Sequence, residues 1–168
     1  MTELDDTGLI LEGMTAQLDE LITLTGRKDP AMVGIHTGGV WIARQLHARL
    51  DIGEPLGSLD ISFYRDDFTR IGMNPVVQPS QLPFSLDNRH IILVDDVLHT
   101  GRTIRAALNE LFDYGRPASI MLATLIERDG RELPIQANVV GRHVKLRPDE
   151  HIKLSGPDPL RLEIKHTA

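Results

Sequence analysis

The residues best suited to chemistry follow directly after an apolar run near the middle of the chain. Two adjacent carboxylates, Asp95 and Asp96, could bind the hydroxyls of a ribose or help to hold Mg²⁺. Thr100, Gly101 and Thr103 then offer hydroxyls and accessible backbone N–H groups where a helix is expected to begin. Because an anion is stabilised at a helix N-terminus, this second group suits a phosphate. The stretch as a whole therefore suits a phosphorylated ribose.

Alternating apolar runs and helical stripes predict the elements that position this stretch. Short apolar runs indicate strands, and apolar residues spaced three or four apart indicate helices. We expect strands at residues 31–36, 59–64, 90–94, 119–126, 137–140 and 160–164, and helices with stripes over residues 14–22, 42–50 and 104–112. This order predicts an α/β fold with a mostly parallel, twisted sheet flanked by helices. Ligands in such folds bind at the carboxyl ends of the strands, where the acidic stretch is expected.

Composition and charge exclude several kinds of protein. The 168 residues fit a single domain, and the absence of cysteine excludes disulfides, thiolate metal sites and thiol nucleophiles. A net charge of −6 excludes a globally basic surface for nucleic acid, and residues 1–30 hold seven acidic side chains against Arg27 and Lys28. There is no signal-peptide pattern and no apolar run near the ~20 residues of a membrane helix. We therefore expect a cytoplasmic protein without a membrane span.

The residues alone leave the identity of this acidic strand end open, because a surface turn or the acidic pocket of a receiver-like domain would also place two carboxylates there. A longer pattern favours the phosphorylated ribose. Residues 94–103 resemble the loop that binds phosphoribosyl pyrophosphate (PRPP) in type I phosphoribosyltransferases. Residues 33–39, 59–67, 115–119 and 131–135 further resemble, in this order, the PyrR family of pyrimidine-operon regulators that are also uracil phosphoribosyltransferases.

This resemblance implies a fold and a reaction. Residues 1–168 would form one type I phosphoribosyltransferase domain, in which the polar, proline-punctuated residues 65–87 form a flexible hood. The implied reaction joins uracil to PRPP and gives UMP and pyrophosphate, with Mg²⁺ as the cofactor and UMP or UTP as further ligands. The implied assembly is a homodimer or a larger homo-oligomer.

The resemblance also assigns roles to residues of this chain. Asp95 and Asp96 would hold the ribose hydroxyls and share Mg²⁺ with PRPP, and His99 lies in the same loop. The remaining roles fall to groups that follow one another along the chain: Thr37, Gly38 and Gly39 at the pyrophosphate; Tyr64, Arg65, Asp66 and Asp67 at the start of the hood; Val97, Leu98, Thr100, Gly101, Arg102 and Thr103 around the 5′-phosphate; and Glu127, Arg128 and Asp129 near the base.

Two positions depart from the family pattern. The pyrophosphate loop usually reads Thr-Arg-Gly, whereas Gly38 replaces the arginine here and removes a charged donor from the leaving group. We therefore expect weakened turnover. His99 stands where the family usually has tyrosine. With an ordinary pKa of about 6.5, a histidine could accept the proton from uracil N1, or it could only fill the space of the tyrosine.

RNA binding is a further function that the resemblance implies. PyrR relatives bind messenger RNA hairpins through a basic face, and Arg131 and Arg142 match residues of that face. Gln136 stands where an arginine is usual, and the N-terminal region is acidic, so both features weaken a phosphate-binding surface. Two hypotheses follow. The protein is an enzyme that also regulates pyrimidine genes through an mRNA leader hairpin, or a catalytically weak or inactive regulator that senses nucleotides through the same pocket.

Overall fold

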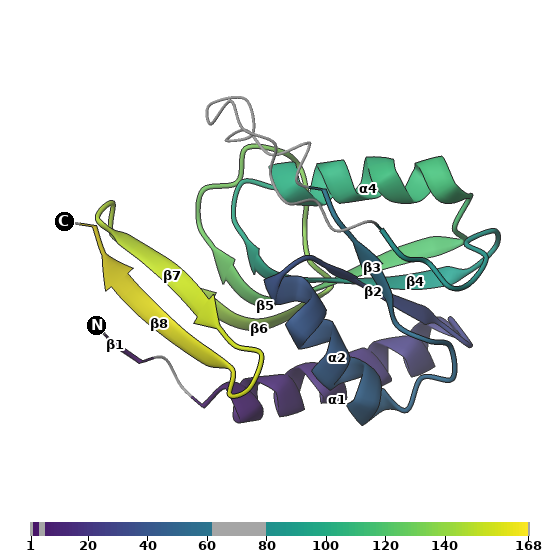
Figure 1. The fold of residues 1–168 in the computed structure, drawn as a ribbon, viewed down its shortest axis with the longest axis horizontal. Helices are drawn as coiled ribbons and strands as arrows, with labels where there is room; N and C mark the ends of the chain where they lie inside the picture. Colours follow the sequence, from purple (N-terminus) through teal and green to yellow (C-terminus); the bar gives the residue numbers. More distant parts are fainter. Residues whose placement is uncertain (1, 4–5, 62–79, 168) are drawn as a thin grey trace.

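A parallel sheet forms the centre of the molecule. The computed structural model describes residues 2–3, 6–61 and 80–167. Five strands pair in the order β3-β2-β4-β5-β6, and each neighbouring pair is parallel, as the sequence predicts (Figure 1). The strands are β2 (Ala31–Ile35), β3 (Gly57–Leu59), β4 (His90–Leu98), β5 (Ser119–Arg128) and β6 (Val139–Val144).

Helices cover both faces of this sheet, which confirms the predicted layers. α1 (Thr7–Thr25) and α2 (Gly38–Leu50) pack on one face, and α4 (Arg102–Tyr114) packs on the other (Figure 1). Successive residues of a strand point to opposite faces, so β4 sends Ile92 toward α1 and α2 and Leu93 toward α4. Two apolar cores therefore hold β4 between the helical layers. Among the described residues, no helix is both long and apolar enough to span a membrane.

A second, smaller sheet packs against α2 and is antiparallel, in the order β1-β8-β7 (Figure 1). β8 (Arg161–His166) confirms the strand expected near the end of the chain. The sequence does not predict β7 (Glu150–Ser155) or β1 (Thr2–Glu3), because charged residues interrupt the apolar pattern of β7 and β1 has only two residues. The turn between β7 and β8 contacts α2, since a Cβ on Gly156 would lie 3.1 Å from a ring carbon of Trp41.

Three strands differ from their predicted bounds by more than two residues. The strand expected at residues 59–64 is β3, which ends at Leu59 because it is an edge strand whose pairing with β2 ends there; residues 62–64 lie outside the described part of the chain. β4 does not stop after its apolar run but continues to Leu98, because its pairing with β5 extends past the acidic residues. The strand expected at residues 137–140 is β6, which continues to Val144 beside β5. In each case the neighbouring strand sets the length.

The end of the segment expected as a hood joins the body of the molecule. Ser58 of β3 pairs with Gln81 in an isolated antiparallel bridge, and each residue donates its N–H to the other's carbonyl oxygen at 2.8 Å. Leu86 is buried in the apolar core on the α4 side of the sheet. Residues 81–86 therefore extend the covered edge of the sheet next to β3.

Candidate functional site

The two acidic residues of the candidate site lie where β4 extends beyond β2. The pairing of β2 with β4 ends at the Gly34–Val94 pair, whereas the pairing of β4 with β5 continues through Leu98. Asp95 and Asp96 therefore stand inside β4 at the carboxyl edge of the sheet, not after its last residue as the apolar run predicts. Asp95 is 4% exposed, and Asp96 is partly exposed. The pairing with β5 thus fixes the backbone that carries both acids.

Local hydrogen bonds orient the two carboxylates. Oδ1 of Asp95 accepts the backbone N–H of Asp96 at 2.8 Å, and Oδ1 of Asp96 accepts the N–H of Val97 at 2.8 Å. Carboxylates offer the hard oxygen ligands that Mg²⁺ prefers. The described residues contain no group of three or more His, Cys, Asp or Glu side chains that could enclose a metal. The pair therefore fits a Mg²⁺ ion that is shared with the phosphates of a ligand.

The loop after β2 lies directly against these acids. The peptide bond that precedes Thr37 is cis, and α2 begins at the next residue, Gly38. A Cβ on Gly38 would lie 2.3 Å from Oδ2 of Asp96, and a Cβ on Gly39 would lie 2.7 Å from the carbonyl oxygen of Val94. At position 39 the close atom belongs to the backbone of β4, so glycine is needed there for the loop to approach the strand so closely. The structure thus brings together the loop expected at a pyrophosphate and the acids expected at a ribose.

The loop after β4 presents an open helix N-terminus to the same edge of the sheet. α4 begins after Gly101, whose φ of +94° favours glycine and which has no side chain to cap the helix. Oγ1 of Thr100 accepts the N–H of Arg102 at 3.2 Å. The N-cap residue of α2, Thr37, also makes no side-chain capping bond, whereas the side chain of Asp6 caps α1. Two helices whose N-cap residues make no side-chain capping bond therefore follow β2 and β4.

Other residues expected around the phosphate take different positions. The side chains of Val97 and Leu98 pack in the apolar cores, so only their backbone can reach the loop. Arg102 is exposed, and its Nε lies 3.4 Å from Oε2 of Glu132. Thr103 is partly exposed in the first turn of α4. Hydroxyl and backbone groups, not Val97 or Leu98 side chains, are thus the groups that this loop offers to an anion.

Residues 131–135, which we call the brace, pack behind this loop. The N–H groups of Glu132 and Leu133 both donate to the carbonyl oxygen of Thr100, at 2.9 and 3.1 Å. A Cβ on Gly101 would lie 3.1 Å from Cγ1 of the isoleucine that ends the brace. The sequence does not predict this contact. Two apolar residues in an otherwise polar stretch, Leu133 and Ile135, are the sequence signal that could have indicated this contact.

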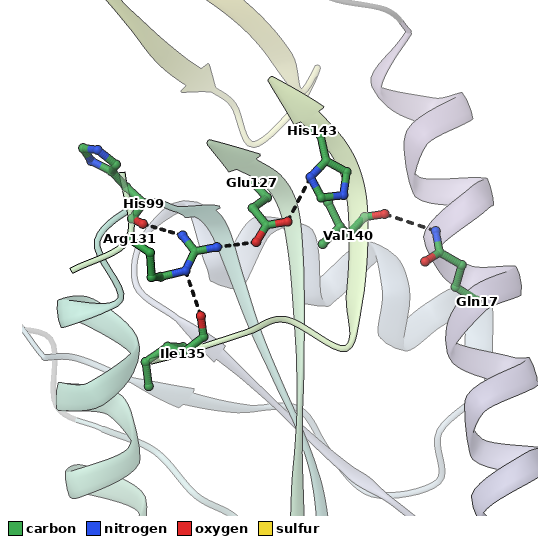
Figure 2. Close-up of polar contacts among 7 residues, drawn as sticks. All are labelled: Gln17, His99, Glu127, Arg131, Ile135, Val140 and His143. Carbon is green, nitrogen blue, oxygen red and sulfur yellow. Dashed lines mark hydrogen bonds and ion pairs between the residues drawn. The ribbon is translucent and has the colours of Figure 1, made fainter. Parts of the chain in front are cut away.

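Arg131 makes three contacts within the chain (Figure 2). Its Nε donates to the carbonyl oxygen of Ile135 at 2.7 Å, its Nη1 donates to the carbonyl oxygen of His99, and its Nη2 pairs with Oε1 of Glu127. The other oxygen of Glu127 lies 2.9 Å from Nδ1 of His143. The Arg131 side chain is 25% exposed. Its guanidinium is therefore held within the molecule, although the resemblance places this residue on an RNA-binding face.

The ring of His99 packs over the turn that follows β5. A Cβ on Gly130 would lie 2.8 Å from Nε2 of His99. Partial burial, and then the positive charge of Arg128, lower the pKa of His99 below its ordinary value; Arg131 acts in the same direction, and Glu132 opposes it. A lowered pKa favours the neutral imidazole, which has one nitrogen able to accept a proton.

The remaining predicted residues fall in three places. Glu127 and Arg128 end β5, and Asp129 is exposed directly after it. Arg142 of β6 lines a surface groove together with Leu9 of α1. The residues expected at the start of the hood lie outside the described part of the chain: Tyr64, Arg65, Asp66 and Asp67.

Comparison with known folds and families agrees with this architecture. The phosphoribosyl transferase domain family matches residues 1–151. A hypoxanthine-guanine phosphoribosyltransferase from Bacillus anthracis has a similar structure, with a TM-score of 0.71 over 90% of this chain and 86% of that one, at 16% identity. A hypoxanthine-guanine-xanthine phosphoribosyltransferase is similar with a TM-score of 0.61 over 86% and 79% of the two chains, at 22% identity. At such identities the likeness concerns the fold alone.

Two bacterial proteins are more similar in sequence, and both are named "Bifunctional protein PyrR". The one from Nitrosococcus oceani is 62% identical over 159 residues, which cover 94% of this chain and 90% of that protein. The one from Pseudomonas aeruginosa is 56% identical over 156 residues, which cover 93% and 92%. Both relatives therefore align with almost the whole of this chain.

Proposed function

This chain belongs to the PyrR family of phosphoribosyl transferase domain proteins, and we propose that it transfers the phosphoribosyl group of PRPP to uracil and also regulates pyrimidine genes. One observation carries the proposal: the glycines of residues 37–39 lie against Asp95 and Asp96. This contact brings the N-terminus of α2 against the two acids, and α4 begins after the same strand, β4, that carries them. Such a set suits a ribose that carries a phosphate at one end and a pyrophosphate at the other.

Each part of PRPP meets a matching group in this arrangement. The 5′-phosphate binds at the N-terminus of α4, among backbone N–H groups and the hydroxyls of Thr100 and Thr103. The ribose hydroxyls donate to Asp95 and Asp96. The pyrophosphate binds at the N-terminus of α2, where the glycine loop exposes its backbone. Mg²⁺, reached by the two carboxylates, would supply positive charge to the pyrophosphate.

The residues of the site also suit the transfer itself. The bond from ribose C1 to the pyrophosphate oxygen breaks, uracil N1 bonds to C1, and N1 loses its proton. Asp95 and Asp96 stabilise the positive charge that develops on the ribose, and the N-terminus of α2 stabilises the departing anion. His99, whose lowered pKa favours the neutral ring, is available to accept the proton. We further propose that the chain works in the cytoplasm as a homo-oligomer.

Formation of UMP from labelled uracil and PRPP tests this proposal. We expect the wild-type protein to form UMP, and Asp96→Asn to lower the rate about 100-fold, because it removes a charge that the transition state needs. Asp113→Asn is the matched control, since Asp113 is exposed in the last turn of α4. An Asp96→Asn rate equal to that of the control would contradict the role of the acidic pair.

A regulator with little catalysis is the second candidate function. Gly38 brings no cation to the leaving group, and Oδ2 of Asp96 fills the space that a side chain at position 38 would need. Such a site still holds a nucleotide phosphate on α4. The protein would then sense UMP, UTP or PRPP and bind an mRNA leader hairpin accordingly.

A hairpin-binding assay, run with and without UMP beside the UMP-formation assay, separates the two candidates. UMP formation without hairpin binding indicates an enzyme alone. Hairpin binding that responds to UMP, without turnover, indicates the regulator. Both results together indicate the bifunctional protein that we propose.

A further inference from the structure

Arg131 contacts the loop after β4 through the carbonyl oxygen of His99. Figure 2 shows its guanidinium between the backbone of the loop, the end of the brace and Glu127, while the imidazole of His99 points away from it. All three guanidinium nitrogens have an acceptor within the chain: a carbonyl oxygen of Ile135, the carbonyl oxygen of His99 and a carboxylate oxygen of Glu127. A guanidinium that makes three such contacts in a fixed geometry orients the groups that it binds.

Glu127 holds this guanidinium in place. Its carboxylate is 15% exposed and lies at the end of β5, where it pairs with Arg131 on one side and with His143 of β6 on the other. β5 and β6 pair in this region through the Glu127–His143 pair itself. The charge of Arg131 is therefore balanced by a carboxylate that belongs to the sheet, and the sheet fixes the position of the guanidinium.

Two successive carbonyl groups of the loop point toward the brace. The carbonyl of His99 accepts from Arg131, and the carbonyl of Thr100 accepts from the N–H groups of Glu132 and Leu133. The peptide bonds of the loop are trans. In a trans peptide the C=O and the N–H point in opposite directions. The N–H groups of Thr100 and Gly101 therefore point away from the brace.

We propose that Arg131 is a positioning residue of the phosphate-binding loop: by holding the His99 carbonyl it turns the N–H of Thr100 toward the phosphate of the ligand. The cation also polarises that peptide group, which strengthens the N–H as a donor. This inference rests on the proposed function, because it takes the ligand to be a phosphorylated ribose. It gives Arg131 a role in the nucleotide site in place of a direct contact with RNA phosphates.

Binding of UMP and of uridine to Arg131 variants tests this role. We expect Arg131→Gln to weaken UMP binding about tenfold and to leave uridine binding within about twofold, because only UMP carries the phosphate that the loop holds. Arg131→Lys keeps the charge but loses the forked geometry, so its loss should be intermediate. Glu127→Gln should weaken UMP binding less than Arg131→Gln, since the amide still accepts from the guanidinium. Arg49→Gln, exposed in the last turn of α2, is the control.

Equilibrium dialysis with labelled UMP and uridine measures these affinities, and thermal unfolding shows that each variant is folded. Equal losses for UMP and uridine would mean a general structural role and would overturn the inference, as would unchanged UMP binding in Arg131→Gln. A loss of hairpin binding by nucleotide-free Arg131→Gln, with UMP binding intact, would assign Arg131 to RNA instead. If the wild-type protein bound no UMP, the proposed function itself would fail, whereas the preceding outcomes leave it standing.

Discussion

The loops after β2 and β4 have the same place in the fold but are held in different ways. Each leads from a central strand to a helix whose N-cap residue makes no side-chain capping bond, and both lie at the carboxyl edge of the sheet (Figure 1). Gly38 and Gly39 bring the first loop into contact with Asp96 and with the backbone of β4. The second loop is held by hydrogen bonds from the brace, residues 131–135.

The difference shows two ways to hold a loop that leads from a strand into a helix. The first loop relies on the absence of side chains at Gly38 and Gly39. A substitution there is tolerated only where the new Cβ meets a side chain that can move and not the backbone. The second loop relies on donors from a segment about thirty residues further along the chain, so its geometry depends on contacts that lie outside the loop. Substitutions in the two loops should therefore lower stability or ligand binding for different physical reasons.

Gly39→Ala should have the largest effect. Its Cβ would lie 2.7 Å from the carbonyl oxygen of Val94 and 3.1 Å from Cα of Asp95, and neither backbone atom can move without disturbing β4. We expect a loss of about 3 kcal/mol in the free energy of unfolding and no measurable UMP formation. Denaturant unfolding and the UMP assay measure both.

Gly13→Ala is the control for this change, because nothing lies within 4 Å of its Cβ in α1. In a helix interior, alanine should raise the free energy of unfolding by about 0.5–1 kcal/mol. Equal stability of the two variants would show that the first loop does not depend on close approach.

Gly101→Ala should have the next largest effect, because it combines a φ of +94° with a packing contact 3.1 Å from the brace. We expect a loss of about 1–2 kcal/mol in stability together with weaker UMP binding. Gly26→Ala isolates the cost of the backbone angle, since Gly26 has a φ of +65° at the end of α1 and nothing within 4 Å. If Gly26→Ala weakened UMP binding as much, the loss could not be assigned to the second loop.

Gly38→Arg should change affinity more than stability. Its Cβ would lie 2.3 Å from Oδ2 and 2.8 Å from Cγ of Asp96, so the variant requires the Asp96 side chain to rotate but meets no backbone atom of β4. We expect little change in unfolding and about tenfold tighter binding of PRPP, because the arginine adds a charged donor near the pyrophosphate. Gly38→Ala brings the same Cβ without the charge and should not tighten binding. Unchanged turnover and PRPP affinity in Gly38→Arg would refute the role of the first loop.

His99→Phe should have the smallest effect, and one that depends on pH. Because folding lowers the pKa of His99, the unfolded chain binds the proton first as the pH falls through about 6.5. Wild-type stability should therefore decline below that pH more steeply than that of His99→Phe, and the two should run parallel above it. Thermal unfolding between pH 8 and 5 measures this difference. A pH–rate profile for UMP formation that is the same in both proteins would exclude His99 as the proton acceptor.

Apolar periodicity predicted the layers of the main sheet, whereas only the family resemblance implied that the two loops bind one ligand. Apolar periodicity depends only on neighbouring residues, so it indicates strands and helices before any packing is known. The contact between Gly38 and Asp96 follows from the pairing of β2 with β4, which periodicity does not predict. Strand bounds were less predictable, because β4 continues past Asp95 only where β5 is present to pair with it. β7 escaped prediction because its residues are mostly charged or polar.

The sequence by itself determined which chemical groups the site contains: two carboxylates, hydroxyls, glycines at two loops, no cysteine and no arginine at position 38. Only the tertiary structure decided what Arg131 contacts. The type of a residue determines how many hydrogen bonds its side chain can donate, but the fold determines which acceptors lie within reach. Here His99, Ile135 and Glu127 surround the guanidinium because β4, β5 and the brace meet at one end of the sheet. An arginine expected to contact RNA is therefore found behind the phosphate-binding loop.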